Sequence, residues 1–252
     1  MNEVATGIRV LMVDDHAVVR AGYRTLLDSA TGIEIVAEAD SGEAGFRLFT
    51  AHCPDVVIMD LSLPGISGLE AIRRIIARDS GAKLLAFSMH EDTAFVEQAL
   101  QAGARGYISK SSAPNVLIEA VRQIAAGNIY LEPEIAQRLA FQKTRGPSSP
   151  FAVLSTREFE IFCLLAEGMN AGEIGDRLSL SAKTVANYST QIKSKLEVTS
   201  IAEIARLAIR HGIVFPAITR RNSQGSRPSA RYNPALPIER RMKKQCVMPE
   251  CC

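Results

Sequence analysis

Five short apolar runs alternate with five segments of helical periodicity in the first half of this chain. The expected strands are 8–13, 33–37, 55–59, 83–87 and 106–108, and the expected helices are 17–29, 42–51, 68–77, 93–102 and 114–126. Strands that alternate with helices in this way form parallel sheets, because each helix returns the chain across a face of the sheet. Residues 1–130 are therefore predicted to form a doubly wound, five-stranded parallel α/β sheet.

The third expected strand ends on a single carboxylate. Asp60 follows the apolar run 56–59, and the Pro64-Gly65 pair ends regular structure soon afterwards. Open α/β sheets bind their ligands at the carboxyl ends of the strands. A strand-end Asp considered alone is more often a solvated surface residue, so the other strand ends decide the interpretation.

Polar side chains follow three of the other expected strands. Asp14 and Asp15 follow the first strand, Ser88 follows the fourth, and the fifth leads to Lys110. Because the carboxyl ends of parallel strands meet at one edge, these groups should converge with Asp60. Three carboxylates at close range repel one another unless a cation neutralises them. Mg²⁺ suits such oxygen ligands and keeps water for an incoming phosphate, so the sequence predicts an Mg²⁺-assisted site for anion transfer.

Residues 8–126 resemble the receiver domain of two-component response regulators. That family has an acidic pair after the first strand, a phospho-accepting Asp after the third, Ser or Thr after the fourth and Lys after the fifth, matched here by Asp14 and Asp15, Asp60, Ser88 and Lys110. The resemblance implies that Asp60 accepts a phosphoryl group from a sensor histidine kinase or from a small acyl phosphate. It also implies that Mg²⁺ is held by Asp15, Asp60 and the Ser62 carbonyl, with Asp14 acting through water.

The same resemblance implies a switch. Lys110 and Ser88 would hold phosphoryl oxygens, and Tyr107 would occupy the space that Ser88 leaves; the alternative for Tyr107 is an ordinary half-buried aromatic. His16 is interpreted as an exposed imidazole at a helix start rather than as a metal ligand. His90, two residues past Ser88, either controls access of water to the acyl phosphate or is an ordinary loop residue.

Residues 131–150 are expected to link two domains. Residues 133–141 have helical spacing, and the polar stretch 142–150 contains Gly and Pro and is interpreted as a flexible tether. Residues 151–215 then show a helical pattern with Ser155 or Thr156 as the first cap. A short helix over 173–178, a tight turn and a longer helix over 182–196 are typical of a helix-turn-helix, whose second helix enters the major groove. A fourth helix is expected over 201–210.

Residues 154–214 resemble the LuxR/NarL-type helix-turn-helix domain, a small four-helix, all-α unit. The matches include Leu154-Ser155-x-Arg157-Glu158, Ser181-x-Lys183-Thr184-Val185 and Ala208-Ile209-Arg210-His211-Gly212. This chain departs from the family pattern in the recognition helix, expected over 182–196. There Ala186 stands in place of a long polar residue and Tyr188 in place of the common His. Gly172 and Gly175 should weaken the preceding helix.

The resemblance implies a set of contacts to double-stranded DNA. Asn187 and Thr190 hold outward positions from which base edges can be read. The expected phosphate-contacting residues are Lys183, Thr184, Tyr188, Lys193 and Lys195. By the same resemblance the fourth helix is the face of a homodimer, through Ile201, Ile204, Ala205 and Ala208; the alternative is that these residues complete the core.

The overall charge hides an uneven distribution. The net charge is +2, yet residues 216–252 carry eight basic and two acidic residues among Pro, Ser and Asn. This composition indicates a disordered basic tail, which either adds nonspecific attraction to DNA or is inert. Cys53 and Cys163 are interpreted as buried thiols, and three more cysteines lie near the end of the tail. A reducing cytoplasm is expected, with no signal peptide and no membrane span.

Three functions are compared on these observations. The first is a transcriptional response regulator, not an enzyme on an external substrate, whose phosphorylation on Asp60 controls dimerisation and DNA binding. The second is a DNA-binding protein that ignores phosphorylation. The third, a phosphatase of the haloacid dehalogenase type, requires a second Asp two residues after the nucleophile, and Ser62 stands there.

Overall fold

The computed structural model describes residues 7–145 and 149–213. The chain divides into two units, Met1–Pro216 and Ala217–Cys252. The second unit lies wholly outside the described residues, so the expected basic tail and its cysteines stay predictions. Within the described ranges no helix is both long and apolar enough to cross a membrane.

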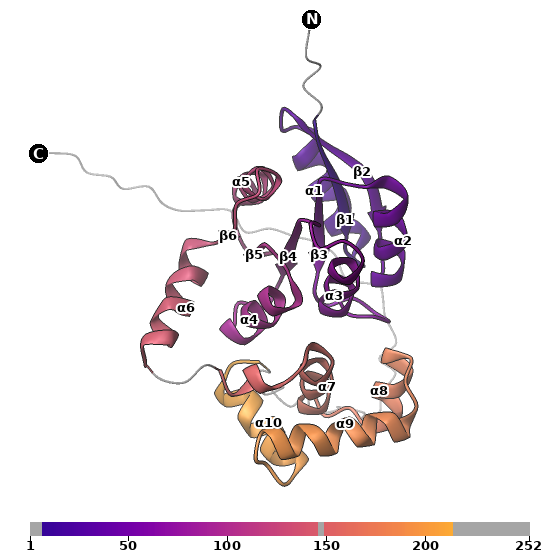
Figure 1. Ribbon diagram of the computed structural model, residues 1–252, viewed down its shortest axis with the longest axis vertical. Coiled ribbons are helices and arrows are strands. Elements are labelled where there is room, and N and C mark those ends of the chain that lie inside the picture. The colour runs from indigo at the N-terminus through magenta and orange to yellow at the C-terminus, as the bar shows by residue number, and fades with distance from the viewer. Residues whose placement is uncertain (1–6, 146–148, 214–252) are drawn as a thin grey trace, which may run out of the picture. The chain divides into compact units, whose positions relative to one another are not determined.

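The first part of the chain forms one parallel sheet (Figure 1). Its strands lie in the order β2-β1-β3-β4-β5-β6, with bounds β1 Ile8–Val13, β2 Ile33–Ala39, β3 Val56–Asp60, β4 Leu84–Ser88, β5 Gly106–Ser109 and β6 Tyr130–Leu131. The five predicted strands are confirmed. The sixth, β6, pairs with β5 through two residues only, too few for an apolar pattern to indicate a strand.

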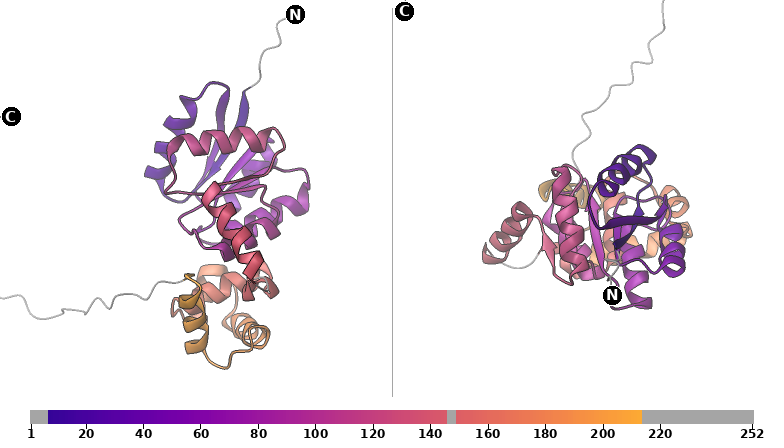
Figure 2. Two further views of the ribbon diagram at one scale, coloured as in Figure 1. Left: turned by 90° about the vertical axis from the view of Figure 1, so that its left-hand side faces the viewer. Right: turned by 90° about the horizontal axis from the view of Figure 1, so that it is seen from above.

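Helices cover both faces of the sheet, as predicted (Figure 2). Val10 and Met12 of β1 pack in one core with α1 (Ala17–Asp28) and α5 (Pro114–Ala125). Leu11 and Val13 point to the other core, which contains α2 (Gly42–His52), α3 (Gly68–Arg78) and α4 (Thr93–Ala102). β3 is buried along its whole length, as expected of a central parallel strand covered on both faces.

A glycine holds the end of β3 against the start of α3. A Cβ atom at Gly68 would lie 1.9 Å from the Asp60 carbonyl oxygen, so any other residue would push the two segments apart. Ser67 caps α3 by accepting the Glu70 N–H at 3.3 Å. Close packing of this turn fixes the backbone that carries Asp60.

The linker contains more regular structure than the sequence indicates. Helix α6 spans Pro133–Arg145, four residues beyond the predicted end at 141, and Ile135 and Leu139 of this helix are buried. The first residues of the expected tether are thus helical, and residues 146–148 lie outside the described ranges. Polar helix formers extend a helix by propensity alone, which an apolar pattern does not report.

The cysteine prediction is wrong at one position. Cys53 is the residue after the last turn of α2, with a φ of 44°, and its side chain is exposed. Cys163 is partly buried, and its burial raises the pKa of the thiol.

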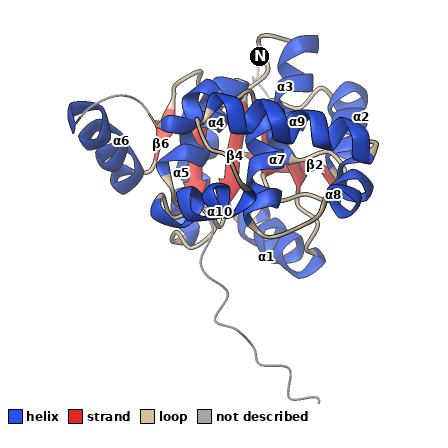
Figure 3. Cartoon of the chain, turned by 90° about the horizontal axis from the view of Figure 1, so that it is seen from below, coloured by secondary structure: helices blue, strands red, loops and turns tan. Residues whose placement is uncertain are grey.

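The last part of the described chain is a bundle of four helices after a short 3₁₀ turn at Pro150–Val153 (Figure 3). The helices are α7 Thr156–Ala166, α8 Ala171–Leu178, α9 Ala182–Lys195 and α10 Ile201–Arg210. Each begins at a polar cap: Ser155 and Asn170 form capping boxes with Glu158 and Glu173, and Ser181 and Ser200 accept N–H groups of α9 and α10. The predicted four-helix unit is confirmed.

Gly175 has a packing role that its helical position does not indicate. A Cβ atom there would lie 2.6 Å from the Leu180 carbonyl oxygen in the turn between α8 and α9, whereas at Gly172 the nearest contact is 3.2 Å away, in the cap. Gly175 therefore permits the tight turn of the helix-turn-helix instead of merely weakening α8.

Candidate functional site

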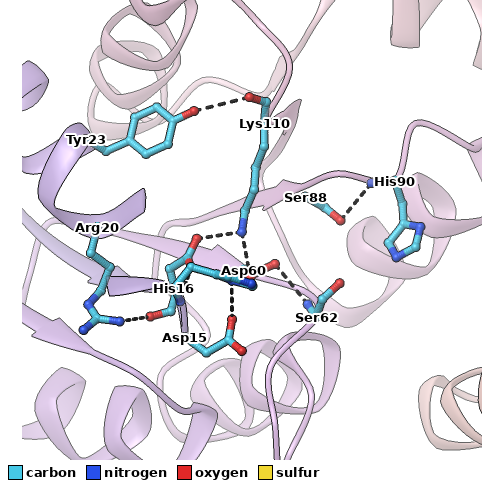
Figure 4. A network of polar contacts seen from close by, with 10 residues as sticks. Asp15, His16, Arg20, Tyr23, Asp60, Ser62, Ser88, His90 and Lys110 are labelled. Carbon is cyan, nitrogen blue, oxygen red and sulfur yellow. Dashed lines mark hydrogen bonds and ion pairs between the residues drawn. The ribbon is translucent and has the colours of Figure 1, made fainter. Parts of the chain in front are cut away.

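The carboxyl ends of three strands bring two acids and one base together. Asp14 follows β1, Asp60 ends β3 and Lys110 follows β5. Lys110 Nζ donates to Asp14 Oδ2 at 2.6 Å and to Asp60 Oδ2 at 2.7 Å (Figure 4). The carboxylates are 2% and 1% exposed and the lysine 9%. One ammonium thus bridges two buried carboxylates, as convergence of the strand ends predicts.

A third acid completes the cluster. Asp15 directly follows Asp14, and its Oδ1 is buried without any hydrogen-bond partner among the described residues. His16 begins the next turn, with its Nδ1 2.8 Å from Asp15 Oδ1 and 3.4 Å from Asp14 Oδ1. Three carboxylates therefore face one lysine, so the site has an excess of negative charge and one buried oxygen that accepts no hydrogen bond.

This donor set fits a divalent cation. One potential ligand atom from each of Asp14, Asp15, His16 and Asp60 lies within 4.8 Å of all the others. Carboxylate oxygens are preferred ligands of Mg²⁺, and an ion would satisfy the free Asp15 oxygen. Ser62 donates its N–H to Asp60 Oδ1 at 3.0 Å, which places its backbone beside the carboxylate; the role of its carbonyl as a ligand stays a prediction.

Burial and neighbouring charges shift the pKa values of Asp60 and Lys110 in opposite directions. Burial raises the pKa of Asp60 above its usual value, although the hydrogen bonds from Lys110 and from the Ser62 N–H lower it. Burial lowers the pKa of Lys110, but its hydrogen bonds to Asp14 and Asp60 outweigh burial and raise that pKa overall. The same contact acts on both groups, because the Lys110 ammonium offsets part of the cost of burying the Asp60 carboxylate.

Ser88 and Tyr107 lie on the neighbouring strands β4 and β5. Ser88 is fully buried at the end of β4, and its Oγ accepts the His90 N–H at 3.2 Å. Tyr107, in β5, is also fully buried, and its hydroxyl donates to the His90 carbonyl at 2.6 Å. Tyr107 thus already holds the inward position, and burial raises the pKa of its phenol.

His90 is not an ordinary exposed loop residue. Its ring stacks on Phe95 of α4 with the ring centres 4.0 Å apart and the planes 7° from parallel. Burial lowers the pKa of the imidazole below its usual value. The two rings form one aromatic stack after Ser88.

The loop after Ser88 is tied to the linker helix. Glu91 accepts hydrogen bonds from Ser109 Oγ at 3.0 Å and Ser111 Oγ at 2.8 Å, both near the end of β5. Arg138 of α6 donates to the Glu91 side chain and to its carbonyl, at 3.3 Å each. A movement of this loop would therefore reach α6 through one glutamate. Sequence periodicity gives no signal for these polar contacts.

The second candidate site is the outer face of α9. Val185 and Ile192 anchor this helix in the core, so the opposite face is free. Lys183, Asn187 and Thr190 are exposed there, as predicted. Gln191, four residues after Asn187, is exposed as well. The sequence interpretation omitted it, although its helical spacing from Asn187 was a sufficient signal.

Three of the other predicted DNA contacts, Lys195, Thr184 and Tyr188, have partners inside the bundle. Lys195 Nζ donates to the buried Glu158 at 2.6 Å, and Thr184 shares a hydrogen bond with Ser181. Tyr188 packs partly against the core, and Lys193 is partly buried. Contacts from Lys195 to DNA would have to compete with this ion pair.

Comparisons with known protein families divide the chain into two matched regions. Residues 10–122 match the response regulator receiver domain, and residues 152–208 match bacterial regulatory proteins of the luxR family. The response regulator UvrY of Escherichia coli K12 is 40% identical over 208 residues, which cover 82% of this chain and 95% of UvrY. The response regulator GacA of Pseudomonas aeruginosa is 41% identical over 212 residues, covering 83% and 99% of the two chains.

Solved structures with the same fold include two regulators. A LuxR-family response regulator from Aurantimonas sp. SI85-9A1 is 43% identical, with a TM-score of 0.54, over 55% of this chain and 99% of that chain. RcsB of Salmonella enterica serovar Typhimurium, bound to the promoter rprA in the presence of the phosphomimetic BeF₃⁻, is 25% identical, with a TM-score of 0.63, over 80% of this chain and 98% of that chain.

Proposed function

Because this chain belongs to the two-component response regulators that join a receiver domain to a LuxR-type DNA-binding domain, we propose that phosphorylation of Asp60 controls how tightly it binds DNA. The observation that carries the proposal is the Lys110 ammonium bridging Asp14 and Asp60 beside the unsatisfied Asp15 oxygen. The family regulates transcription. The proposal concerns the residues, the metal and the route by which this chain does so.

Asp60 is the nucleophile in the phosphoryl transfer. Its Oδ1 is held by the Ser62 N–H and its Oδ2 by Lys110. A carboxylate oxygen forms a bond to phosphorus while the bond from phosphorus to the histidine nitrogen of a sensor kinase breaks, and the imidazole keeps that electron pair. Mg²⁺ held by Asp15, Asp60 and the Ser62 carbonyl, with Asp14 acting through water, would supply positive charge to the phosphoryl oxygens.

Lys110 and Ser88 respond to the new charge. The Lys110 ammonium exchanges part of its contact with Asp60 for a phosphoryl oxygen, and the Ser88 hydroxyl donates to another. Moving Ser88 Oγ breaks its contact with the His90 N–H, so the segment from Ser88 to Glu91 shifts. Since Glu91 bonds to Arg138 of α6, the shift reaches the helix that leads to the DNA-binding domain.

A homodimer that reads double-stranded DNA is the responding state. Ile204 and Ala208, which were expected in the dimer face, lie in the core of the bundle. Ile201 and Ile209 of α10 are 41% and 44% exposed and, with Ala205 between them, follow one face at a spacing of four residues. This stripe is the dimer face we propose. RcsB, which shares the fold, was solved on a promoter with a phosphomimetic.

DNA affinity with and without phosphorylation tests the proposal. The full chain is treated with acetyl phosphate and Mg²⁺, mixed with fragmented genomic DNA, and the bound fragments are sequenced and then titrated as labelled duplexes. We expect treatment to tighten binding of the wild type and of a surface control, Asp28→Asn, but not of Asp60→Asn. No tightening in the wild type would leave a DNA-binding protein that ignores phosphorylation. Equal tightening in Asp60→Asn would mean that a group other than Asp60 responds to the phosphodonor.

A further inference from the structure

His16 stands where a side chain would ordinarily cap helix α1. Its backbone has an extended conformation, with φ −87° and ψ 102°, but its side chain makes no capping hydrogen bond. The imidazole instead turns toward the acidic pair, while its own N–H donates to Asp14 Oδ1 at 2.8 Å (Figure 4). The ring is 65% exposed, as the sequence interpretation expected, yet Nδ1 points into the site.

The distances around Nδ1 are those of neighbouring ligands on one ion. Bonds of about 2.1 Å place adjacent ligands roughly 3.0 Å apart on an octahedral ion and roughly 3.4 Å apart on a tetrahedral one. Nδ1 lies 2.8 Å from Asp15 Oδ1 and 3.4 Å from Asp14 Oδ1. The closer pair is not aligned as a hydrogen bond, because Asp15 Oδ1 has no hydrogen-bond partner. The two atoms are within ion-pair distance, so a cation placed between them would replace that contact without breaking a hydrogen bond.

We propose that His16 Nδ1 is a direct ligand of the divalent cation, and that this site therefore takes a late first-row ion such as Co²⁺ more tightly than Mg²⁺. The inference rests on the proposed cation site and adds a nitrogen to its oxygen ligands. Mg²⁺ gains little from imidazole, whereas Fe²⁺, Co²⁺, Ni²⁺ and Zn²⁺ bind it well. Three ionised carboxylates and the single positive charge of Lys110 give the site a net charge that a divalent cation would neutralise.

Binding of Co²⁺ and of Mg²⁺ to the full chain, measured separately by calorimetry, tests this ligand. Cys246, Cys251 and Cys252 are replaced by Ser in every protein compared, so that thiols of the tail do not bind Co²⁺. The variants are His16→Ala and, as a matched control, His52→Ala, which removes a histidine at the end of α2 outside the cluster. Because the His16 ring is largely exposed, its removal should leave the fold intact, which circular dichroism checks.

We expect His16→Ala to weaken Co²⁺ binding by about 10-fold or more and Mg²⁺ binding by less than about 2-fold. His52→Ala should change neither. The Co²⁺-loaded wild type should also show a strongly shifted imidazole N–H resonance that His16→Ala lacks. Unchanged Co²⁺ affinity, or equal losses for both ions, would make His16 an ordinary surface imidazole while the oxygen site stands. Failure of Mg²⁺ to bind the wild type would overturn the proposed cation site itself.

Discussion

Replacing Lys110 with methionine tests what holds two buried carboxylates together. Lys110 Nζ lies within 2.7 Å of both Asp14 Oδ2 and Asp60 Oδ2. Methionine keeps much of the side-chain volume but removes the charge, so two like charges would face each other out of water. Removing one partner of a buried ion pair costs about 3–5 kcal/mol. We expect Lys110→Met to lower the free energy of unfolding of the metal-free receiver domain by about 3 kcal/mol at neutral pH.

Acidification and added Mg²⁺ should each restore part of the stability that Lys110→Met loses. Burial raises the pKa of Asp60 in the folded protein. A folded-state pKa above the unfolded one means that stability is highest below the unfolded value and falls as pH rises through the folded value. Acidification should therefore reduce the difference in the free energy of unfolding between Lys110→Met and the wild type. Mg²⁺ at about 100 times its Kd adds about 2.7 kcal/mol to a folded state that alone binds it. At a fixed concentration the variant should gain more, because Lys110 no longer competes for the carboxylates.

Urea unfolding followed by hydrogen exchange measures this domain separately. Peptides from β1 and β3 report the unfolding of the receiver sheet, independently of the DNA-binding bundle. Lys183→Met, at an exposed lysine of α9, controls for the loss of a lysine. The electrostatic account of the site is wrong if Lys110→Met matches the wild type without metal, or if Mg²⁺ stabilises both proteins equally.

Three further predictions concern residues outside the acidic cluster of Asp14, Asp15 and Asp60. Lys195→Met should lower the stability of the DNA-binding bundle by about 1 kcal/mol. Burial raises the pKa of Glu158, but Lys195 and the helix cap outweigh burial and lower that pKa overall. The loss of stability in Lys195→Met should therefore be present at neutral pH and disappear in acid unfolding titrations as Glu158 protonates. A loss of stability that does not change with pH would contradict the ion pair. Gly175→Ala should lower the thermal midpoint despite the better helix propensity of Ala, because the added Cβ meets the backbone of the turn. Gly172→Ala should be neutral or stabilising. A lower thermal midpoint for Gly172→Ala than for Gly175→Ala would refute the packing role of Gly175. Tyr107→Phe should cost about 1 kcal/mol in urea unfolding, for one lost hydrogen bond, and no loss would mean that the hydroxyl is solvated.

The cluster of Asp14, Asp60 and Lys110 could be located from the sequence because the fold brings the strand ends together. In a parallel sheet the residues after each strand share one edge, so Asp14, Asp60 and Lys110 had to meet once the alternation of strands and helices was recognised. The same reasoning does not reach the loop contacts. Nothing in the apolar pattern indicates that Glu91 bonds to Arg138, or that His90 stacks on Phe95.

Side-chain partners account for most of the remaining differences. The pattern shows that Ile204 and Ala208 face inward or toward a partner, but not which, and the structure places both in the core. The family resemblance implies a DNA contact for Lys195, whereas the structure shows its ammonium bonded to the buried Glu158 of a different helix. A two-residue strand such as β6 exists through its pairing with β5 and has no periodicity of its own.

Phosphoryl transfer to Asp60 is the central claim, and intact-mass spectrometry tests it most directly. The full chain is incubated with acetyl phosphate and Mg²⁺ and measured before the acyl phosphate hydrolyses, beside Asp60→Asn and a sample with the metal chelated. We predict one added phosphoryl group on the wild type, mapped to the peptide that contains Asp60, and none in either control. An unmodified wild type, or the same adduct on Asp60→Asn, would contradict the claim.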